Sequence, residues 1–154
     1  MKIISNLIEA HLFKETANGL EFLLLKRNNN QIYAGIWQMV SGKIKDGEKA
    51  TETVLREIQE ETQLKPLKLW VIPRINSFYS DSDDSICLVP VFAALVSQNS
   101  NVVISDEHSE HKWVNALEAK KMLAWDGQRK AVDLIEEYFL NEMSFLNFVE
   151  VKIK

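Results

Sequence analysis

Apolar and polar positions along the chain divide it into segments with strand or helix periodicity. Short segments rich in apolar residues predict β-strands over residues 3–13, 20–26, 36–40, 67–77, 86–96 and 111–114. Strong helix formers or helically spaced apolar residues, without glycine or proline, predict helices over residues 48–62, 116–123 and 128–140. In the last helix the apolar positions form a stripe typical of core packing, made by Ala131, Leu134, Ile135 and Tyr138.

Polar and glycine-containing stretches between these segments predict turns and loops. Asn18-Gly19 is a strong β-hairpin signal, and residues 27–35 form a polar loop. Residues 41–47 hold two of the five glycines and are expected to form a loop as well. The acidic stretch 80–85 lacks the glycine and glutamate spacing of a calcium loop, so a solvated loop is expected there.

The composition fits one folded domain over residues 1–154. The chain is 46% hydrophobic and 26% charged, with no Pro/Gly/Ser-rich linker and no internal repeat. Its formal net charge of −4 argues against nucleic-acid binding through a general basic surface. The longest apolar run, residues 86–96, is much shorter than the roughly 20 residues of a membrane helix.

The N-terminus and the cysteine content favour a cytoplasmic protein. Residues 1–6 lack the apolar core of a secretory signal. Cys87 is the only cysteine, so no internal disulfide can form, and its apolar surroundings predict a buried thiol. Neither a membrane nor a nucleic acid is therefore an expected partner.

Three carboxylates are concentrated on one side of the first predicted helix. Glu57, Glu60 and Glu61 are spaced i, i+3 and i+4, so they lie within one turn of each other. Their repulsion disfavours the helix unless a hard divalent cation lies between them, and Mg²⁺ and Mn²⁺ prefer such oxygen ligands. A neighbouring apolar arc can hold this helix on a sheet and consists of Ala50, Val54 and Ile58.

The carboxylates belong to a longer pattern over residues 42–64. It begins at Gly42, continues with Glu48, and ends with Arg56-Glu57, an aliphatic residue, one further residue, Glu60-Glu61 and the closing Leu64. At these positions the chain resembles the Nudix hydrolase family. One position departs from the Nudix box: Gln63 stands where a glycine normally ends the helix in a left-handed conformation, which predicts local strain or a different helix end. No carboxylate of the box is missing.

The resemblance implies an α/β fold, the Nudix α/β/α sandwich around a mixed β-sheet, extending to about residue 140. It also implies a hydrolase that cleaves a diphosphate bond in a substrate with a nucleoside diphosphate linked to another moiety. Water attacks phosphorus, and Mg²⁺ or Mn²⁺ stabilises the charge that develops. A small anionic substrate would then be held through the metal, although the protein is acidic.

The same resemblance assigns roles to the residues of the box. Glu57 and Glu61 are implied to be the main metal ligands, with Glu60 beside them and the Gly42 carbonyl as a further ligand. Arg56 is implied to orient the carboxylates and to pair with Glu48, which it reaches only if the chain folds back before the helix. One of the carboxylates would activate the attacking water.

Sequence outside the box resembles one subgroup more than others. The stretches 106–108, 111–114 and 125–129 look like those of the bacterial dATP pyrophosphohydrolases, also known as dihydroneopterin triphosphate pyrophosphatases of folate synthesis. In that group, a glutamate in a Glu-His step binds metal or acts as the catalytic base, and Glu107 matches it. His108 and His111 are either substrate contacts or structural residues.

Three further residues are candidates for substrate binding. Trp37 would stack on a base or pterin, with a core position as the alternative. Lys26 and Arg27 would contact phosphates, with an exposed basic pair as the alternative. Trp113 is expected in the core.

The expected function is cleavage of a nucleoside or pterin triphosphate to the monophosphate and pyrophosphate. The alternatives are a Nudix hydrolase for 8-oxo-dGTP, a dinucleoside polyphosphate or ADP-ribose, and a non-catalytic nucleotide-binding domain. Intact box carboxylates disfavour the non-catalytic alternative. A monomer and a homodimer are both open, and the tail 141–154 either packs back, forms an edge strand or makes a dimer contact.

Overall fold

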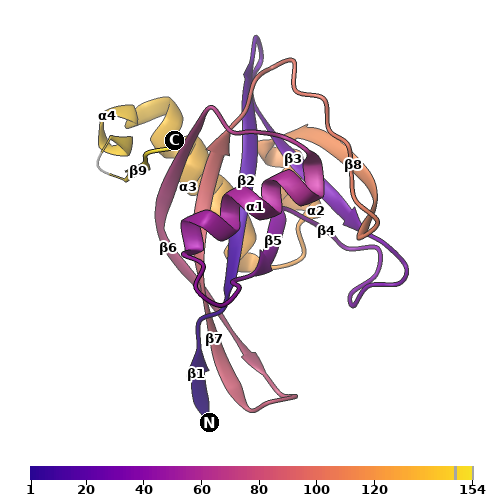
Figure 1. Ribbon diagram of the computed structural model, residues 1–154. Helices are drawn as coiled ribbons and strands as arrows, with labels where there is room; N and C mark the ends of the chain where they lie inside the picture. Colours follow the sequence, from indigo (N-terminus) through magenta and orange to yellow (C-terminus); the bar gives the residue numbers. More distant parts are fainter. Residues whose placement is uncertain (148, 154) are drawn as a thin grey trace.

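A mixed sheet with helices on both faces forms the protein, and the computed structural model describes residues 1–147 and 149–153 (Figure 1). The strands of this described part are β1 Lys2–Ile4, β2 Leu7–Thr16, β3 Gly19–Arg27, β4 Trp37–Gln38, β5 Val40–Lys43, β6 Lys68–Ser80, β7 Ser85–Leu95, β8 His108–Asn115 and β9 Glu150–Val151. Its helices are α1 Ala50–Thr62, α2 Ala116–Met122, α3 Asp126–Asn141 and α4 Met143–Leu146.

The sheet is built around the parallel pair β2 and β7. Its strand order is β4-β3-β2-β7-β6-β9, with β1 added to β7, β5 to β2 and β8 to β3. The β1–β7 and β2–β7 pairs are parallel and the others are antiparallel, so the sheet is mixed. The β2–β3 hairpin closes with Thr16 opposite Gly19, which confirms the turn expected from Asn18-Gly19.

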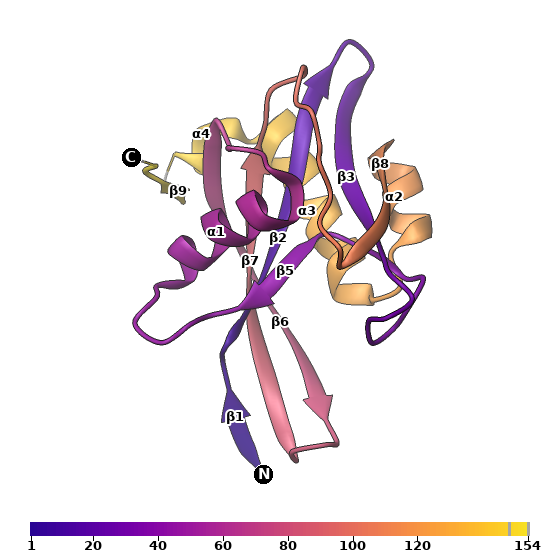
Figure 2. The same cartoon turned by 45° about the vertical axis from the view of Figure 1, so that its right-hand side comes forward.

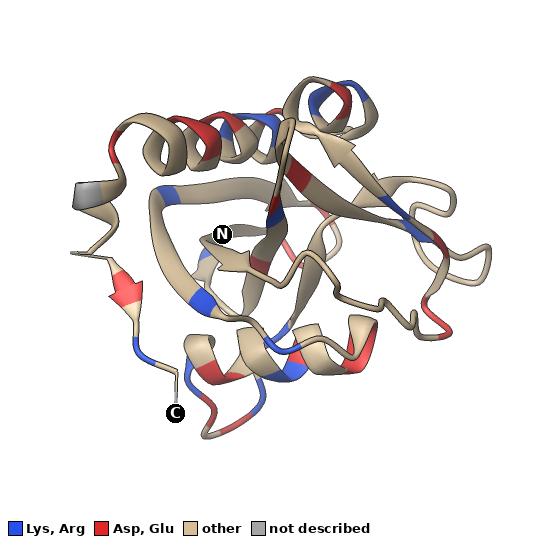
Figure 3. Ribbon diagram, turned by 90° about the horizontal axis from the view of Figure 1, so that it is seen from above, with Lys and Arg blue, Asp and Glu red and all other residues tan. Residues whose placement is uncertain are grey.

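Two apolar clusters cover the two faces of the sheet. On one face, Val54 and Ile58 of α1 pack against buried β2 residues that include Ala10 and Leu12. On the other face, α2 and α3 pack against Phe13, Phe22 and their neighbours. Figure 3 shows these helical layers on opposite sides of the sheet. The α/β/α sandwich expected from the sequence is therefore confirmed.

Element boundaries near the box differ from those expected. The sequence predicted a loop over residues 41–47, but β5 continues to Lys43 because this segment pairs with the start of β2. The helix begins at Ala50 rather than at residue 48, because Lys49 is the N-cap and Glu48 lies in the preceding turn. The predicted strand 3–13 is two strands in the structure, β1 and β2.

Several local expectations agree with the structure. Cys87 is buried and unpaired. The acidic loop after β6 is an exposed turn, and Trp113 packs against the α1-side cluster. Gln63 follows α1 with φ 60° and ψ 23°, so the helix ends in the left-handed conformation although a glutamine stands there.

The C-terminal segment packs back on the sheet. The strand β9 pairs with the start of β6, with Val151 opposite Leu69. Leu146 is buried in the α3-side cluster, whereas Phe145 is exposed. Phe148, an apolar tail residue noted in the sequence, lies outside the described residues.

At the end of the molecule away from the C-terminal segment, β1 and the parts of β6 and β7 next to their connecting loop project from the body (Figure 2). In the part of the chain that the structure describes, no helix has both the length and the apolar character needed to cross a membrane.

Candidate metal-binding active site

Helix α1 presents two of its three box carboxylates to the protein interior. Glu57 is 9% exposed and Glu61 is 2% exposed, and they lie one turn apart on the same face. Glu60 points outward, with 52% of its side chain exposed. The helical spacing thus brings Glu57 and Glu61 together inside the fold and leaves Glu60 at its edge.

Arg56 fixes the position of Glu57 through a network of hydrogen bonds. Its Nε and Nη2 atoms donate to the two carboxylate oxygens of Glu48 at 2.7 and 2.9 Å, so the chain does fold back before the helix. Nη1 donates to Glu57 Oε1 at 2.6 Å and to Glu60 Oε2 at 3.2 Å, and Nη2 to the Lys43 carbonyl at 2.9 Å. Because of the Arg56 hydrogen bonds, the pKa of the Glu48 carboxyl is well below its ordinary value.

Gly42 lies directly against the Glu57 carboxyl group. A Cβ atom built on Gly42 would overlap the side chain of Glu57. The backbone of Gly42 does not have positive φ, so the glycine is required by this close approach and not by its conformation. The box begins with a glycine because strand β5 lies directly against the Glu57 carboxylate of α1.

A second acidic residue and a histidine meet Glu61 from the other side. Ligand atoms of Glu61, Glu107 and His108 all lie within 4.8 Å of one another, and Nε2 of His108 is 3.7 Å from Glu61 Oε1. Both carboxylate oxygens of Glu61 and the Nδ1 atom of His108 are buried without a hydrogen-bond partner among the described residues. Such orphaned polar atoms are costly unless something binds them.

The electrostatics of this cluster fit a divalent cation. Burial raises the pKa of Glu61, and the charges of Glu57 and Glu107 raise it further. Burial lowers the pKa of His108 to about 4, so its imidazole is neutral at pH 7. Carboxylate oxygens are the ligands that Mg²⁺ and Mn²⁺ prefer, and a cation among Glu57, Glu61 and Glu107 would relieve their repulsion.

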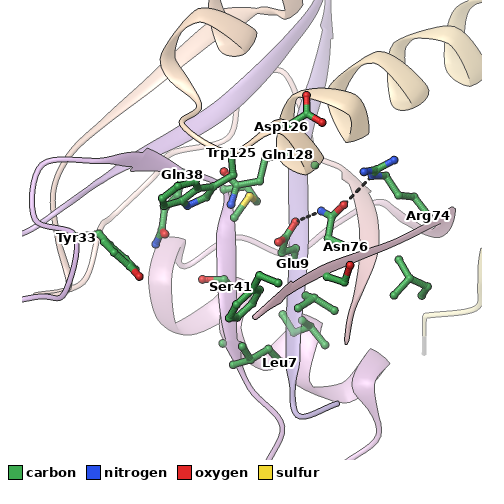
Figure 4. Close-up of a pocket in the computed structure, with 18 of the residues that line it drawn as sticks. Leu7, Glu9, Tyr33, Gln38, Ser41, Arg74, Asn76, Trp125, Asp126 and Gln128 are labelled. Carbon is green, nitrogen blue, oxygen red and sulfur yellow. Dashed lines mark hydrogen bonds between the residues drawn. The ribbon is translucent and has the colours of Figure 1, made fainter. Parts of the chain in front are cut away.

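A cavity of about 770 Å³ lies beside the start of the box, with Ser41 and Gly42 in its wall (Figure 4). Gly42, which touches Glu57, lines it, and so does Gln38, whose Nε2 atom lies 3.2 Å from His108 Nε2. Residues of the cavity wall come from distant parts of the chain and include Glu9, Tyr33, Arg74, Asn76, Phe78, Trp125 and Gln128. The rings of Tyr33 and Trp125 meet edge to face, with centroids 5.8 Å apart.

The three residues suggested for substrate binding do not lie together. Arg27 lines the cavity, where its Nε atom donates to the Ile32 carbonyl at 2.6 Å. Trp37 packs against the α3-side cluster, with the Lys26 ammonium 6.0 Å from its ring centroid. Neither Trp37 nor Lys26 is part of the described cavity lining. Their proposed contacts with substrate remain predictions.

Sequence reasoning missed the polar residues of the cavity. Glu9 and Asn76 lie on strands β2 and β6, outside the box, and carry no motif. One signal was available for Glu9, since it is a charged residue within the mostly apolar stretch 7–13. His108 was noted without a decided role, and the structure places it beside Glu61 and Glu107 in a group that could hold a metal ion, whereas His111 is exposed.

Comparison with known proteins agrees with this geometry. A family model described as the NUDIX domain matches residues 10–135. The chain belongs to the NUDIX family. The expected enzyme class, a Nudix hydrolase, is thereby confirmed.

This NUDIX protein has relatives with more specific names. It is 28% identical over 101 residues to the nucleoside triphosphatase NudI of Salmonella typhimurium, a match that covers 60% of this chain and 72% of NudI. A NUDIX hydrolase structure from Listeria monocytogenes is 27% identical with a TM-score of 0.76, covering 88% of this chain and 94% of that one. The dihydroneopterin triphosphate pyrophosphohydrolase structure from E. coli has a TM-score of 0.69 at 21% identity, covering 84% and 93%, which shows a shared fold alone.

Proposed function

We propose that this NUDIX hydrolase is a pyrophosphohydrolase dependent on Mg²⁺ or Mn²⁺. Its substrate would be a nucleoside or pterin triphosphate, of the dATP or dihydroneopterin triphosphate type, cleaved to the monophosphate and pyrophosphate. The observation that carries the proposal is the group of Glu61, Glu107 and His108, in which both Glu61 oxygens are buried without a partner among the described residues, with Glu57 one turn away on the same helix face.

The residues that would hold the cation are Glu57, Glu61 and Glu107, with Glu60 and the Gly42 carbonyl as further ligands from the family pattern. When bound, the ion would neutralise phosphate oxygens and lower the pKa of the attacking water. His108 contributes a neutral imidazole to the same group. Its contact with Gln38 connects the cluster to the wall of the cavity.

The remaining chemistry belongs to side chains of this protein. Water attacks phosphorus, a new P–O bond forms, and the bridge between the α- and β-phosphates breaks, so that monophosphate and pyrophosphate leave. Glu107 or Glu57 would accept the proton that the water loses. Arg56 acts as a positioning residue, because its hydrogen bonds hold Glu57 against Gly42 and anchor the preceding turn through Glu48.

The triphosphate substrate class rests on two supports. A cavity of about 770 Å³ lies in the range of roughly 300–1,000 Å³ that is usual for small-molecule sites. The related Salmonella protein, 28% identical over 101 residues, is named as a nucleoside triphosphatase. We therefore place triphosphates ahead of ADP-ribose and dinucleoside polyphosphates.

The test is Mg²⁺-dependent pyrophosphate release by Glu57→Gln and Glu61→Gln variants. We expect each to lose at least about 100-fold in kcat, because each removes a charge that would bind the cation. The matched control is Glu137→Gln, which neutralises an exposed glutamate on α3 and should retain wild-type activity. Near wild-type activity in either active-site variant would contradict the assignment, and cleavage of ADP-ribose alone would exclude the proposed substrates.

A further inference from the structure

A hydrogen-bonded chain of polar side chains lies on the wall of the cavity and starts at Glu9, which pairs with Ser41 just before the Nudix box. Asn76 Nδ2 donates to Glu9 Oε2 at 2.9 Å, and Arg74 Nε donates to Asn76 Oδ1 at 2.7 Å. Figure 4 shows these three side chains in line, reaching from β2 and β6 toward the start of α3. The proposed phosphate chemistry uses none of them.

The direction of these hydrogen bonds decides what Glu9 can offer a ligand. Because Arg74 occupies the amide oxygen of Asn76, the amide nitrogen must face Glu9. Gly127 leaves room for this side chain, since a Cβ atom there would overlap the Asn76 amide. Among the described residues, Glu9 has no other side-chain hydrogen bond, so Oε1 and a second lone pair on Oε2 are open to a ligand.

A second acceptor in the cavity lining belongs to Gln128 of α3. Oε1 of Gln128 is buried and has no hydrogen-bond partner among the described residues. Burial raises the pKa of Glu9, while the Asn76 hydrogen bond and the nearby Arg74 charge oppose this rise. The acceptors on Glu9 and Gln128 suit a ligand that brings N–H donors.

The walls around these acceptors suit a flat ring. Tyr33 and Trp125 meet edge to face, and Phe78 is half exposed on the same cavity lining. Aromatic side chains bind heterocyclic bases through their faces, which gives affinity without distinguishing one base from another. The choice among bases then depends on the polar edge that meets Glu9.

We infer that Glu9 recognises the two adjacent N–H groups of a 2-amino-4-oxopyrimidine ring, the edge shared by guanine and pterins. A carboxylate accepts both N–H groups side by side. Adenine and cytosine instead present one donor and one acceptor at the corresponding edge, so a ring nitrogen would face a Glu9 lone pair. The inference rests on the proposed triphosphate hydrolysis and narrows it, favouring dihydroneopterin triphosphate and guanine nucleotides over dATP.

The decisive variant is Glu9→Gln, compared with wild type on dihydroneopterin triphosphate, dGTP, dATP and dCTP. With Asn76 donating to the new amide oxygen, the amide nitrogen becomes a donor facing the base. We expect kcat/KM to fall about 10- to 100-fold for the pterin and guanine substrates, since a bidentate pair discriminates between bases by about that factor. The value for dATP should stay constant or rise. Glu15→Gln is the control, because Glu15 is an exposed glutamate of the same strand.

The readout is the ratio of guanine to adenine activity, which a merely structural role of Glu9 would leave unchanged. An equal loss on all four substrates, or no loss, would overturn the inference. Wild-type failure to cleave any triphosphate would refute the proposed function instead. In that case, calorimetric binding of neopterin, deoxyguanosine and deoxyadenosine without metal tests Glu9 separately. We expect wild type to bind neopterin and deoxyguanosine more tightly than deoxyadenosine, and Glu9→Gln to lose this preference. Equal binding of all three compounds by wild type would exclude the proposed role of Glu9.

Discussion

Glu61 illustrates how a residue suited to bind a cation destabilises the protein when no cation is bound. Its carboxyl group is buried, lacks hydrogen-bond partners among the described residues, and lies near Glu57 and Glu107. These features raise its pKa, so the folded protein holds a proton that the unfolded chain releases near pH 4.5. The contribution of Glu61 to the free energy of unfolding is therefore largest below pH 4.5 and decreases as the pH rises above this value.

Replacing Glu61 with glutamine should consequently stabilise the metal-free protein. At pH 7 to 8 in EDTA, we expect Glu61→Gln to raise the free energy of unfolding by about 1–3 kcal/mol, because glutamine removes the cost of holding a charge or an extra proton beside Glu57 and Glu107. Added Mg²⁺ should raise the melting temperature of wild type and not that of the variant. Thermal unfolding with and without Mg²⁺ checks both. A variant less stable than wild type in EDTA would show that Glu61 is stabilised by contacts and not by a cation.

At the scale of elements, the end of α1 shows a cost that its sequence predicted. Gln63 has φ 60°, a conformation that residues with a Cβ atom adopt only at some energetic expense. Its backbone N–H still donates to the Gln59 carbonyl at 2.9 Å, so the helix end is intact. The strain expected from the missing glycine is present, and the alternative of a different helix end is not realised.

Substitution Gln63→Gly should relieve this strain. We expect the free energy of unfolding to rise by about 1 kcal/mol, with activity unchanged. Gln59→Gly is the matched control, because a glycine at an exposed position within the same helix should lower the free energy of unfolding by about the same amount. Denaturant titrations of the two variants should thus move in opposite directions. A lower free energy of unfolding for Gln63→Gly than for wild type would mean that the glutamine side chain makes a stabilising contact.

Sequence alone predicted these elements well where their residues interact locally. The box helix follows from its spacing of apolar and acidic residues, and Arg56 reaches Glu48 as the family resemblance implied. Strand β5 was missed beyond Val40, because a polar Ser-Gly-Lys segment forms a strand only through pairing with β2. The contact of Glu9 with Asn76 was not predictable either, since 67 residues separate the two in sequence.

At the scale of the whole molecule, the central strand contains a residue that makes the fold sensitive to acid. His11 lies in β2, is 1% exposed, and its Nε2 atom has no partner among the described residues. Burial lowers its pKa to about 4 from an ordinary value of 6.5. Between these values the unfolded chain binds a proton that the folded protein does not, so the free energy of unfolding decreases as the pH falls from 6.5 to 4.

We expect this effect to reach about 3 kcal/mol at pH 4, since each pKa unit corresponds to about 1.4 kcal/mol. Urea unfolding of His11→Phe and wild type between pH 4 and pH 7 measures it, and the variant should show a flatter dependence on pH. His111→Gln, which changes an exposed histidine, should keep the wild-type dependence. Parallel curves for His11→Phe and wild type would exclude His11 as the source.

The position of the cavity also determines when during synthesis the protein can become active. Its walls combine residues 7–9, 38–42, 74–79 and 125–128, which come from nearly the full length of the chain. In a nascent chain whose α3 segment has not yet emerged from the ribosome, the cavity lacks Trp125, Gln128 and Gly127, the glycine that lies against Asn76. The candidate cation ligands Glu57, Glu61, Glu107 and His108 all precede α3 in the chain, so they are made before the cavity is complete. Cation binding is thus able to precede nucleotide binding during translation, and a partly made chain has no complete pocket in which to bind a base.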